Sequence, residues 1–449
     1  MFLAMVLVAG ACSSTEVRSV EAPARGEIRD FGPVPVFGDA ELSAEVDDAI
    51  SVLFDDGFGE ATLSEEADAI ATFGASGDVR LGWVLSDMLR LARDEPQPEL
   101  LAKASSDLLG TDFEAPGAWR DLTDHLMAWD IPAPPGYLDI KRSILTSVVP
   151  DWEPFFDESS DVDWRLISWG GVLIDDRPFG TTDDSCRCIP AADNPTVSSA
   201  DDALWLGDDD VIFGVEINGE SRAYPRRIME VREMVNDSLG GRDFAMPYCT
   251  LCGSAQVWFT DDLPAGVDRP VLRTSGLLTR SNKVMFDLNT FSVFDTFLGT
   301  AVTGPLAQDG ITLRQHSVVT STWGQWRADH PNTTVLVEEL ALRRDFDFRN
   351  GRDADGPIFP IGAVDPRLPV HEDVLGVISS DGKPVAFHVD SALAALERGD
   401  DITIDGIMIV ADGSGLRAVD ATGGDLGGHE AFWFAWSQFY PDTVIWPAG

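Results

Sequence analysis

The residues best suited to chemistry are four cysteines in two close pairs. Cys249 and Cys252 form a Cys-x-x-Cys motif in FAMPYCTLCGSAQVWF, and Cys186 and Cys188 lie in DDSCRCIPAADNP. Paired thiols can ligate a metal, cycle between dithiol and disulfide, or form structural disulfides. Together, the four thiols could build a tetrahedral zinc site. They could also form disulfides from one pair to the other, because Cys186 and Cys188 are poorly spaced to form a disulfide with each other.

The segment after the motif argues against a redox pair of the thioredoxin type. Such a pair needs its first sulfur at a helix N-terminus, whose dipole stabilises the thiolate. Residues 254–259, SAQVWF, read as an extended strand, so this support is expected to be absent. Structural disulfides, a zinc or copper site and a redox centre all stay open, and an oxidising compartment favours the disulfides.

Further motifs surround both cysteine pairs. In order, they are WGGVLIDD (169–176), CIPAADNP (188–195), GVEINGESRAYPRRIMEVREMVND (214–237), YCTLCGSA (248–255), SGLLTRSNKVMFDLNTFSVFD (275–295), TGPL (303–306) and TWGQWRADHP (322–331). This series resembles the bacterial family known as domain of unknown function 3179, over about residues 165–446. The resemblance implies a domain often found in exported or lipid-anchored proteins, sometimes behind helical repeats, and it implies no particular reaction.

The resemblance also marks individual positions. Those that the chain shares with the family are Tyr224, Glu233, Asn236, Asp237, Tyr248, Cys249, Cys252, Gly253, Ser275, Gly276, Ser281, Asp287, Thr290 and Gly304. Many relatives carry His where this chain has Arg232, and Trp and Gln where it has Phe294 and Thr296. Arginine stays protonated and has no acceptor, so it cannot replace a histidine as ligand or proton carrier. The stretch from about 177 to 187, which brings Cys186, is an insertion relative to the family.

Two kinds of role are expected among the polar positions. The candidate proton carriers of a cysteine-using enzyme are Glu233, Asp287 and Ser281. The candidate ligand contacts are Arg232, Tyr248, Ser275 and Asn236. For the serines and Asp287 the alternative is turn chemistry, because the chain has no Gly-x-Ser-x-Gly elbow and Ser-Gly patterns favour turns.

Other charged groups could bind ions. Six arginines flank the shared motifs: Arg222, Arg226, Arg227, Arg232, Arg273 and Arg280. They can line a pocket for a small anion, or pair with the surplus carboxylates. Residues 343–359 contain five side chains with oxygen atoms at intervals that would suit a calcium site, although the segment does not match the EF-hand loop. The five are Asp345, Asp347, Asn350, Asp353 and Asp355. No pair of the six histidines has the spacing of metal ligands on a helix face.

Composition restricts the partners. The chain carries 76 acidic against 32 basic residues, a formal charge of -44, and this field repels nucleic-acid phosphates and anionic lipid headgroups. Nucleic-acid binding is therefore excluded. Hydrophobic residues make up 44% of the chain, enough for packed cores over its 449 residues.

The N-terminus predicts export. Residues 1–12, MFLAMVLVAGAC, form an apolar run that is too short to span a bilayer and ends in small residues and Cys12. The run VAGAC resembles a bacterial lipoprotein signal, in which Cys12 would be lipidated. An ordinary cleaved signal peptide is the alternative. We expect an extracytoplasmic protein whose contact with the membrane is a lipid anchor only.

The elements that position these residues change type near residue 150. After a linker at 20–39, apolar residues recur every three or four positions in 45–54, 65–73, 79–94 and 98–109, which predicts short helices packed in a helical-repeat-like unit over 40–150. Beyond it, short apolar runs alternate with turn signals. The clearest is 211–225, a hairpin with its turn at Asn218-Gly219.

A weak internal repeat organises the β-rich part. Trp323, Trp326, Pro331 and Thr333 recur 110 positions later as Trp433, Trp436, Pro441 and Thr443, and a second hairpin is expected at Asp381-Gly382. We therefore predict an α+β fold in which the helical unit precedes two diverged copies of one supersecondary unit, at 151–340 and 341–449. Residues 1–19 are assigned to the signal.

Three functions are compatible with this sequence. The preferred one is a lipid-anchored binding protein of the cell envelope, with a cysteine-stabilised or metal-holding site and a small ligand or envelope protein as partner. The second is an enzyme that uses Cys249 and Cys252 with Glu233 and Asp287. The third is an interaction scaffold that works through the helical unit.

Overall fold

The computed structural model describes residues 23–92, 96–157, 160, 162–338 and 356–447. The predicted signal with Cys12 lies outside the described residues. So do all five candidate calcium ligands between 345 and 355.

The first part of the chain is helical. Its α-helices are α1 (Ala44–Phe54), α2 (Leu63–Ala75), α3 (Gly82–Leu91), α4 (Gln97–Leu109), α5 (Ala118–Ala128) and α6 (Tyr137–Val148). Thr62 and Glu65 form a capping box that starts α2, and Gly110 ends α4 in the left-handed conformation. Within the described ranges, no helix is long and apolar enough to cross a membrane.

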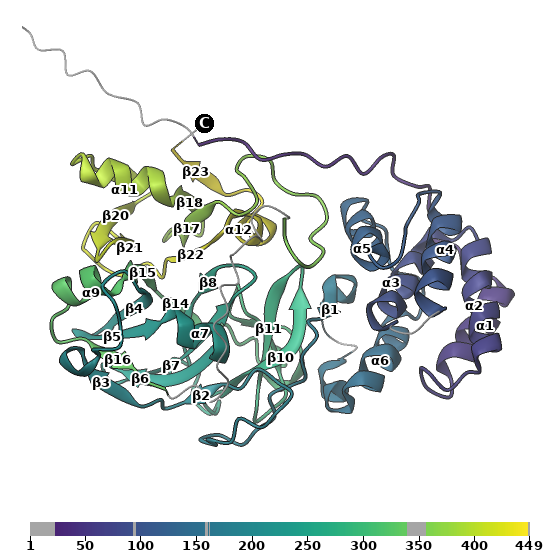
Figure 1. Cartoon of the computed structure of the whole chain (residues 1–449), viewed down its shortest axis with the longest axis horizontal. Helices are drawn as coiled ribbons and strands as arrows, with labels where there is room; N and C mark the ends of the chain where they lie inside the picture. The colour runs from purple at the N-terminus through teal and green to yellow at the C-terminus, as the bar shows by residue number, and fades with distance from the viewer. Residues whose placement is uncertain (1–22, 93–95, 158–159, 161, 339–355, 448–449) are drawn as a thin grey trace, which may run out of the picture.

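After residue 166 the described part of the chain folds into five β-sheets in a propeller-like arrangement (Figure 1). The first contains β1 (Ile167–Trp169), β10 (Leu272–Thr279), β11 (Asn282–Asp287), β12 (Val293–Asp295) and β13 (Thr300–Ala301). The second contains β14 (Arg314–His316), β9 (Val257–Phe259), β7 (Arg242–Cys249), β6 (Met234–Leu239) and β2 (Ala192–Asp193), with β8 (Ser254–Ala255) paired to β7.

Of the other three sheets, one runs in the order β15 (Val319–Thr322), β4 (Val211–Ile217), β5 (Glu220–Pro225), β16 (Thr334–Leu336) and β3 (Val197–Ser199). The next has the order β22 (His429–Phe432), β17 (Asp373–Ile378), β18 (Pro384–His388) and β23 (Val444–Trp446). The last comprises β19 (Ile402–Ile404), β20 (Ile407–Asp412) and β21 (Gly415–Val419). Short helices connect the strands of the five sheets: α7 (Arg226–Arg232), α8 (Gly304–Gln308), α9 (Trp323–Asp329), α11 (Val389–Glu397) and α12 (Trp433–Phe439).

The predicted fold of two diverged copies is wrong for the β-rich region. Among the described strands, a shared strand order is found between the sets β15-β4-β5-β16 and β22-β17-β18-β23. In each, a buried tryptophan, Trp326 or Trp436, lies on a glycine of the sheet and donates its indole N–H to a threonine hydroxyl at 3.0 Å. Within the described ranges, the sheets that contain β10, β7 and β20 do not share this strand order. The repeated tryptophan motif therefore marks two of the sheets and does not define the whole architecture.

One apolar core joins the helices to the first sheet. Phe155, in the 3-10 turn after α6, packs on Phe286 of β11 at 5.3 Å between ring centroids. The Trp152 indole donates to the carbonyl of Ser275 in β10 at 2.8 Å. Figure 1 shows the helices beside β1, β10 and β11. The helical region therefore fixes the β10–β11 hairpin, which forms one side of the site described next.

Candidate functional site

The Cys-x-x-Cys motif forms the turn between β7 and β8. Cys249 and Cys252 are joined by a disulfide, with 5.3 Å between their Cα atoms, and Gly253 takes the left-handed conformation that lets the chain reverse. The sulfurs lie 3.9 and 3.5 Å from the carbonyl oxygen of Ser281, at the tip of the β10–β11 hairpin. No helix follows the motif, as the sequence predicts, so the thiolate-stabilising dipole is absent here.

A cavity of about 240 Å³ opens beside this turn, and we call it the cysteine cavity. It is lined by Cys249, Thr250 and Leu251 from the turn, by the end of α7, by β10, and by Lys283 of β11. Cys249 lines the cavity and is 4% exposed, whereas Cys252 is fully buried behind it. The two sulfurs of one disulfide therefore differ in their access to the cavity.

A buried ion pair faces the same space. The Lys283 ammonium lies 2.6 Å from Oε2 of Glu233 and donates to the Glu233 carbonyl at 3.0 Å. The Thr250 hydroxyl donates to Oε1 of Glu233 at 3.0 Å, which ties the pair to the cysteine turn. Burial lowers the pKa of Lys283, and the Glu233 carboxylate opposes that shift.

Glu233 owes its position to the end of helix α7. It caps the helix in the left-handed conformation, at φ 47°, where a non-glycine residue is uncommon. Its backbone N–H donates to the carbonyl of Met229 and its carbonyl accepts from the backbone N–H of Tyr248. This conformation turns the chain from α7 into β6 beside the end of β7.

The three candidate proton carriers do not converge on the cysteine cavity. Among them, Glu233 alone lines it. Asp287 accepts from the Val271 and Thr290 backbone N–H groups and from the Thr290 hydroxyl, which is the turn chemistry named as the alternative. Ser281 contributes its carbonyl next to the sulfurs, while its hydroxyl is buried with no hydrogen-bond partner in the described part of the chain.

The candidate ligand contacts are held by the protein itself. The Ser275 hydroxyl donates to the Val284 carbonyl, and the Asn236 amide bonds to Asp193 and to the Leu272 backbone. Tyr248 is buried against Phe213, 4.8 Å between ring centroids. None of these side chains lines the cysteine cavity.

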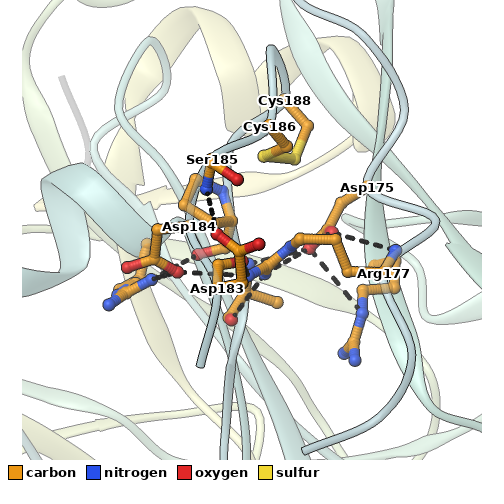
Figure 2. The surroundings of a disulfide bond; sticks show 11 residues. Asp175, Arg177, Asp183, Asp184, Ser185, Cys186 and Cys188 are labelled. Carbon is orange, nitrogen blue, oxygen red and sulfur yellow. Dashed lines mark hydrogen bonds and ion pairs between the residues drawn. A yellow bond between two sulfur atoms is a disulfide. The ribbon is translucent and has the colours of Figure 1, made fainter. Parts of the chain in front are cut away.

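Arg232 belongs to a charged network under the inserted loop. Its guanidinium contacts Glu338 at 2.5 Å and Asp184 at 2.8 Å. Asp184 also contacts Arg177, which pairs with the fully buried Asp175 (Figure 2). Arg232 therefore anchors the insertion and does not stand in for a histidine ligand.

The second cysteine pair closes on itself in this loop. Cys186 and Cys188 form a disulfide with 5.1 Å between Cα atoms (Figure 2). Bridges from this pair to Cys249 and Cys252 were predicted, and that pairing is wrong. The four-thiol zinc or copper site is not formed either, and the described ranges contain no group of three or more His, Cys, Asp or Glu side chains placed to hold a metal.

Most of the flanking arginines pair with carboxylates. Besides Arg232, the pairs are Arg222 with Asp237, Arg226 with Glu230, Arg227 with Asp210, and Arg273 with Asp193 and Asp175. Arg273 is completely buried, and its guanidinium lies 2.6 Å from Asp193. Arg280 is the exception, since its side chain has no ion pair within the described ranges.

Sequence reasoning missed Lys283 as a site residue. The lysine lies 50 positions from Glu233, and only the pairing of β10 with β11 and their packing against the end of α7 bring the two together. One signal was available: Lys283 is one of only four lysines in the chain and lies in an apolar strand, where a charge needs a partner.

Comparison with known proteins identifies a family and no activity. The model of the family described as "Protein of unknown function (DUF3179)" matches residues 186–425, slightly more than half of the chain. No curated protein and no solved structure matches. The chain belongs to this family of proteins of unknown function.

Proposed function

We propose that the protein is an exported, lipid-anchored protein of the cell envelope that binds a small ligand in the cysteine cavity. The observation that carries this proposal is the cavity itself, where a disulfide, a buried ion pair and an apolar wall meet. Binding sites combine apolar walls with a few fixed polar groups in this way.

The lining indicates a ligand of mixed character. The Thr274 hydroxyl lines the cavity, is buried, and has no hydrogen-bond partner among the described residues. Buried polar groups usually find a partner, so a ligand atom can fill this role. Val172, Ile189 and Leu278 supply aliphatic surface nearby. A small, uncharged molecule with one polar end and a hydrocarbon body fits these groups, because the charges of Glu233 and Lys283 already neutralise each other.

The disulfide stabilises one wall of the cavity. It closes the four-residue turn that carries Thr250, and Thr250 in turn holds the Glu233 carboxylate. A cross-link of this size restricts the unfolded chain by about 2 kcal/mol in the chain-entropy view. A structural role for the bridge is thus compatible with ligand binding.

Thiol labelling tests whether the cavity is open at Cys249. We expect methyl methanethiosulfonate to modify Cys249 in the Cys252→Ser variant at least about tenfold faster than Cys252 in the Cys249→Ser variant, because only Cys249 lines the cavity. Mass spectrometry of the quenched mixtures gives both rates. Equal rates, or no modification of either thiol in the folded protein, would remove the basis for the proposal.

A second candidate function is thiol–disulfide exchange, favoured by the unequal access to the two sulfurs. A thiolate of a dithiol partner would attack Sγ of Cys249, and Cys252 would leave as a thiolate. The second partner thiolate then releases Cys249, so two electrons pass from the partner to the disulfide. The Cys252→Ser variant, which cannot resolve a mixed disulfide, should then accumulate a glutathione adduct at Cys249 from glutathione disulfide. If methyl methanethiosulfonate labels Cys249 rapidly but the glutathione adduct does not form, thiol–disulfide exchange is contradicted and ligand binding remains the proposed function.

Export and anchoring rest on the N-terminal sequence and agree with disulfides, which persist in oxidising compartments. We expect the full chain, expressed in bacteria fed radiolabelled palmitate, to carry the label and to sediment with membranes. The Cys12→Ser variant should lose both properties, because the thiol that takes the lipid is gone. Equal labelling of the variant contradicts the anchor, and an unlabelled, secreted wild type indicates an ordinary signal peptide.

A further inference from the structure

A second cavity, of about 340 Å³, lies on the other side of the β10–β11 hairpin. Its polar lining comes from separate elements: Asp163 and Trp164 before β1, Thr279 and Arg280 at the end of β10, Asp295 of β12, Thr303, and Gln438 of α12. We call it the arginine cavity. It shares one lining residue, Leu277, with the cysteine cavity.

Hydrogen-bond donors in this cavity lack acceptors. The Arg280 side chain makes no ion pair within the described ranges, although the chain is strongly acidic. The Trp164 side chain is 8% exposed, and its indole N–H is buried with no partner there. The amide nitrogen and oxygen of Gln438 are likewise buried and unpaired. Unpaired buried donors are costly, so the Trp164 indole and the Gln438 amide, which lie beside the half-buried Arg280 side chain, indicate a missing acceptor.

The acids that line the cavity do not supply that acceptor. Asp163 is held by Arg165, with contacts of 2.9 and 2.7 Å. Asp295 accepts from the backbone N–H groups of Phe297 and Leu298, and burial raises its pKa to about 6. Their presence makes the cavity unfavourable for a ligand with two negative charges, such as phosphate, because like charges at short range repel.

The remaining lining is apolar and favours a ligand with a hydrocarbon part. Leu166, Val284, Val293 and Phe439 face the cavity from four different elements or turns. Apolar surface buried against such walls contributes roughly 25 cal/mol per Å². An inorganic anion would leave these walls without contacts.

We propose that the arginine cavity binds an organic monocarboxylate. Its carboxylate accepts hydrogen bonds from Arg280, the Trp164 indole and the Gln438 amide, and its hydrocarbon body packs on the aliphatic walls. This proposal stands on different residues from those of the cysteine cavity, so either can fail alone.

Titration calorimetry of the full chain with octanoate tests the proposal, with octanamide as an uncharged probe of the same shape. Octanoate should bind, and Arg280→Gln should weaken its binding at least about tenfold, because the charge-assisted contacts are lost. Octanamide should bind both proteins alike. Arg327→Gln is the matched control, since Arg327 pairs with Asp208 on the surface and should leave octanoate binding unchanged.

A second variant covers the case in which Arg280→Gln does not fold. Gln438→Leu removes the unpaired amide and should also weaken octanoate binding. No binding of octanoate at millimolar concentration, or equal binding by wild type, Arg280→Gln and Gln438→Leu, overturns the proposal. If octanamide binds the wild type as tightly as octanoate does, the site recognises only the hydrocarbon part of the ligand, and the carboxylate proposal is wrong.

Discussion

Replacing Lys283 with methionine is expected to lower the free energy of unfolding by about 3–5 kcal/mol, because it leaves the buried Glu233 carboxylate without its cation. The pair lies 2.6 Å apart and both side chains are at most 10% exposed. Urea denaturation of wild type and variant, followed by tryptophan fluorescence, gives the difference.

A double variant separates loss of a contact from exposure of a charge. Lys283→Met with Glu233→Gln should recover much of the loss, since no buried charge then remains unpaired. Lys383→Met is the matched control, because Lys383 pairs with Asp381 on the surface and the change should leave the free energy of unfolding close to that of wild type. If Lys283→Met is as mild as Lys383→Met, the buried pair does not support the cavity wall.

Replacing Arg273 with methionine is expected to cost a similar amount, about 3–5 kcal/mol. This side chain is completely buried between Asp193 and Asp175, and the substitution leaves two carboxylates behind. Because Asp175 also holds Arg177 under the Cys186–Cys188 loop, the loop should lose protection. Hydrogen exchange over 175–190 and chemical denaturation measure the two effects.

Arg269→Met serves as the control for this change, since Arg269 makes a partly exposed pair with Asp243. It should alter stability little and leave exchange over 175–190 as in wild type. Faster exchange in both variants would mean that the loop is not held by the Arg273 network.

Local features of this fold were predictable from the sequence. The hairpin with its turn at Asn218-Gly219 is confirmed as β4 and β5, and both turn residues have positive φ. The hairpin at Asp381-Gly382 is confirmed as β17 and β18. Such turns depend on residues adjacent in the sequence, whose backbone preferences are strong.

Contacts between distant segments were not predictable in the same way. In two of the sheets a strand pairs with a partner far away in the sequence, β1 with β10 and β2 with β6, and no short-range pattern encodes those partners. Cross-pairing of the cysteines was a wrong prediction for the same reason, since it assumed that the two motifs meet. Lys283 was overlooked because its partner lies on another element.

The central claim, that the cysteine cavity takes a small uncharged ligand, is tested most directly by saturation-transfer NMR with isobutyramide. We expect a signal from wild type that is lost in Leu251→Trp, where the larger side chain fills the half-buried edge of the cavity. The signal should persist in Leu298→Trp, which changes an exposed residue outside the cavity. The same signal from all three proteins, or none from wild type, would contradict the account.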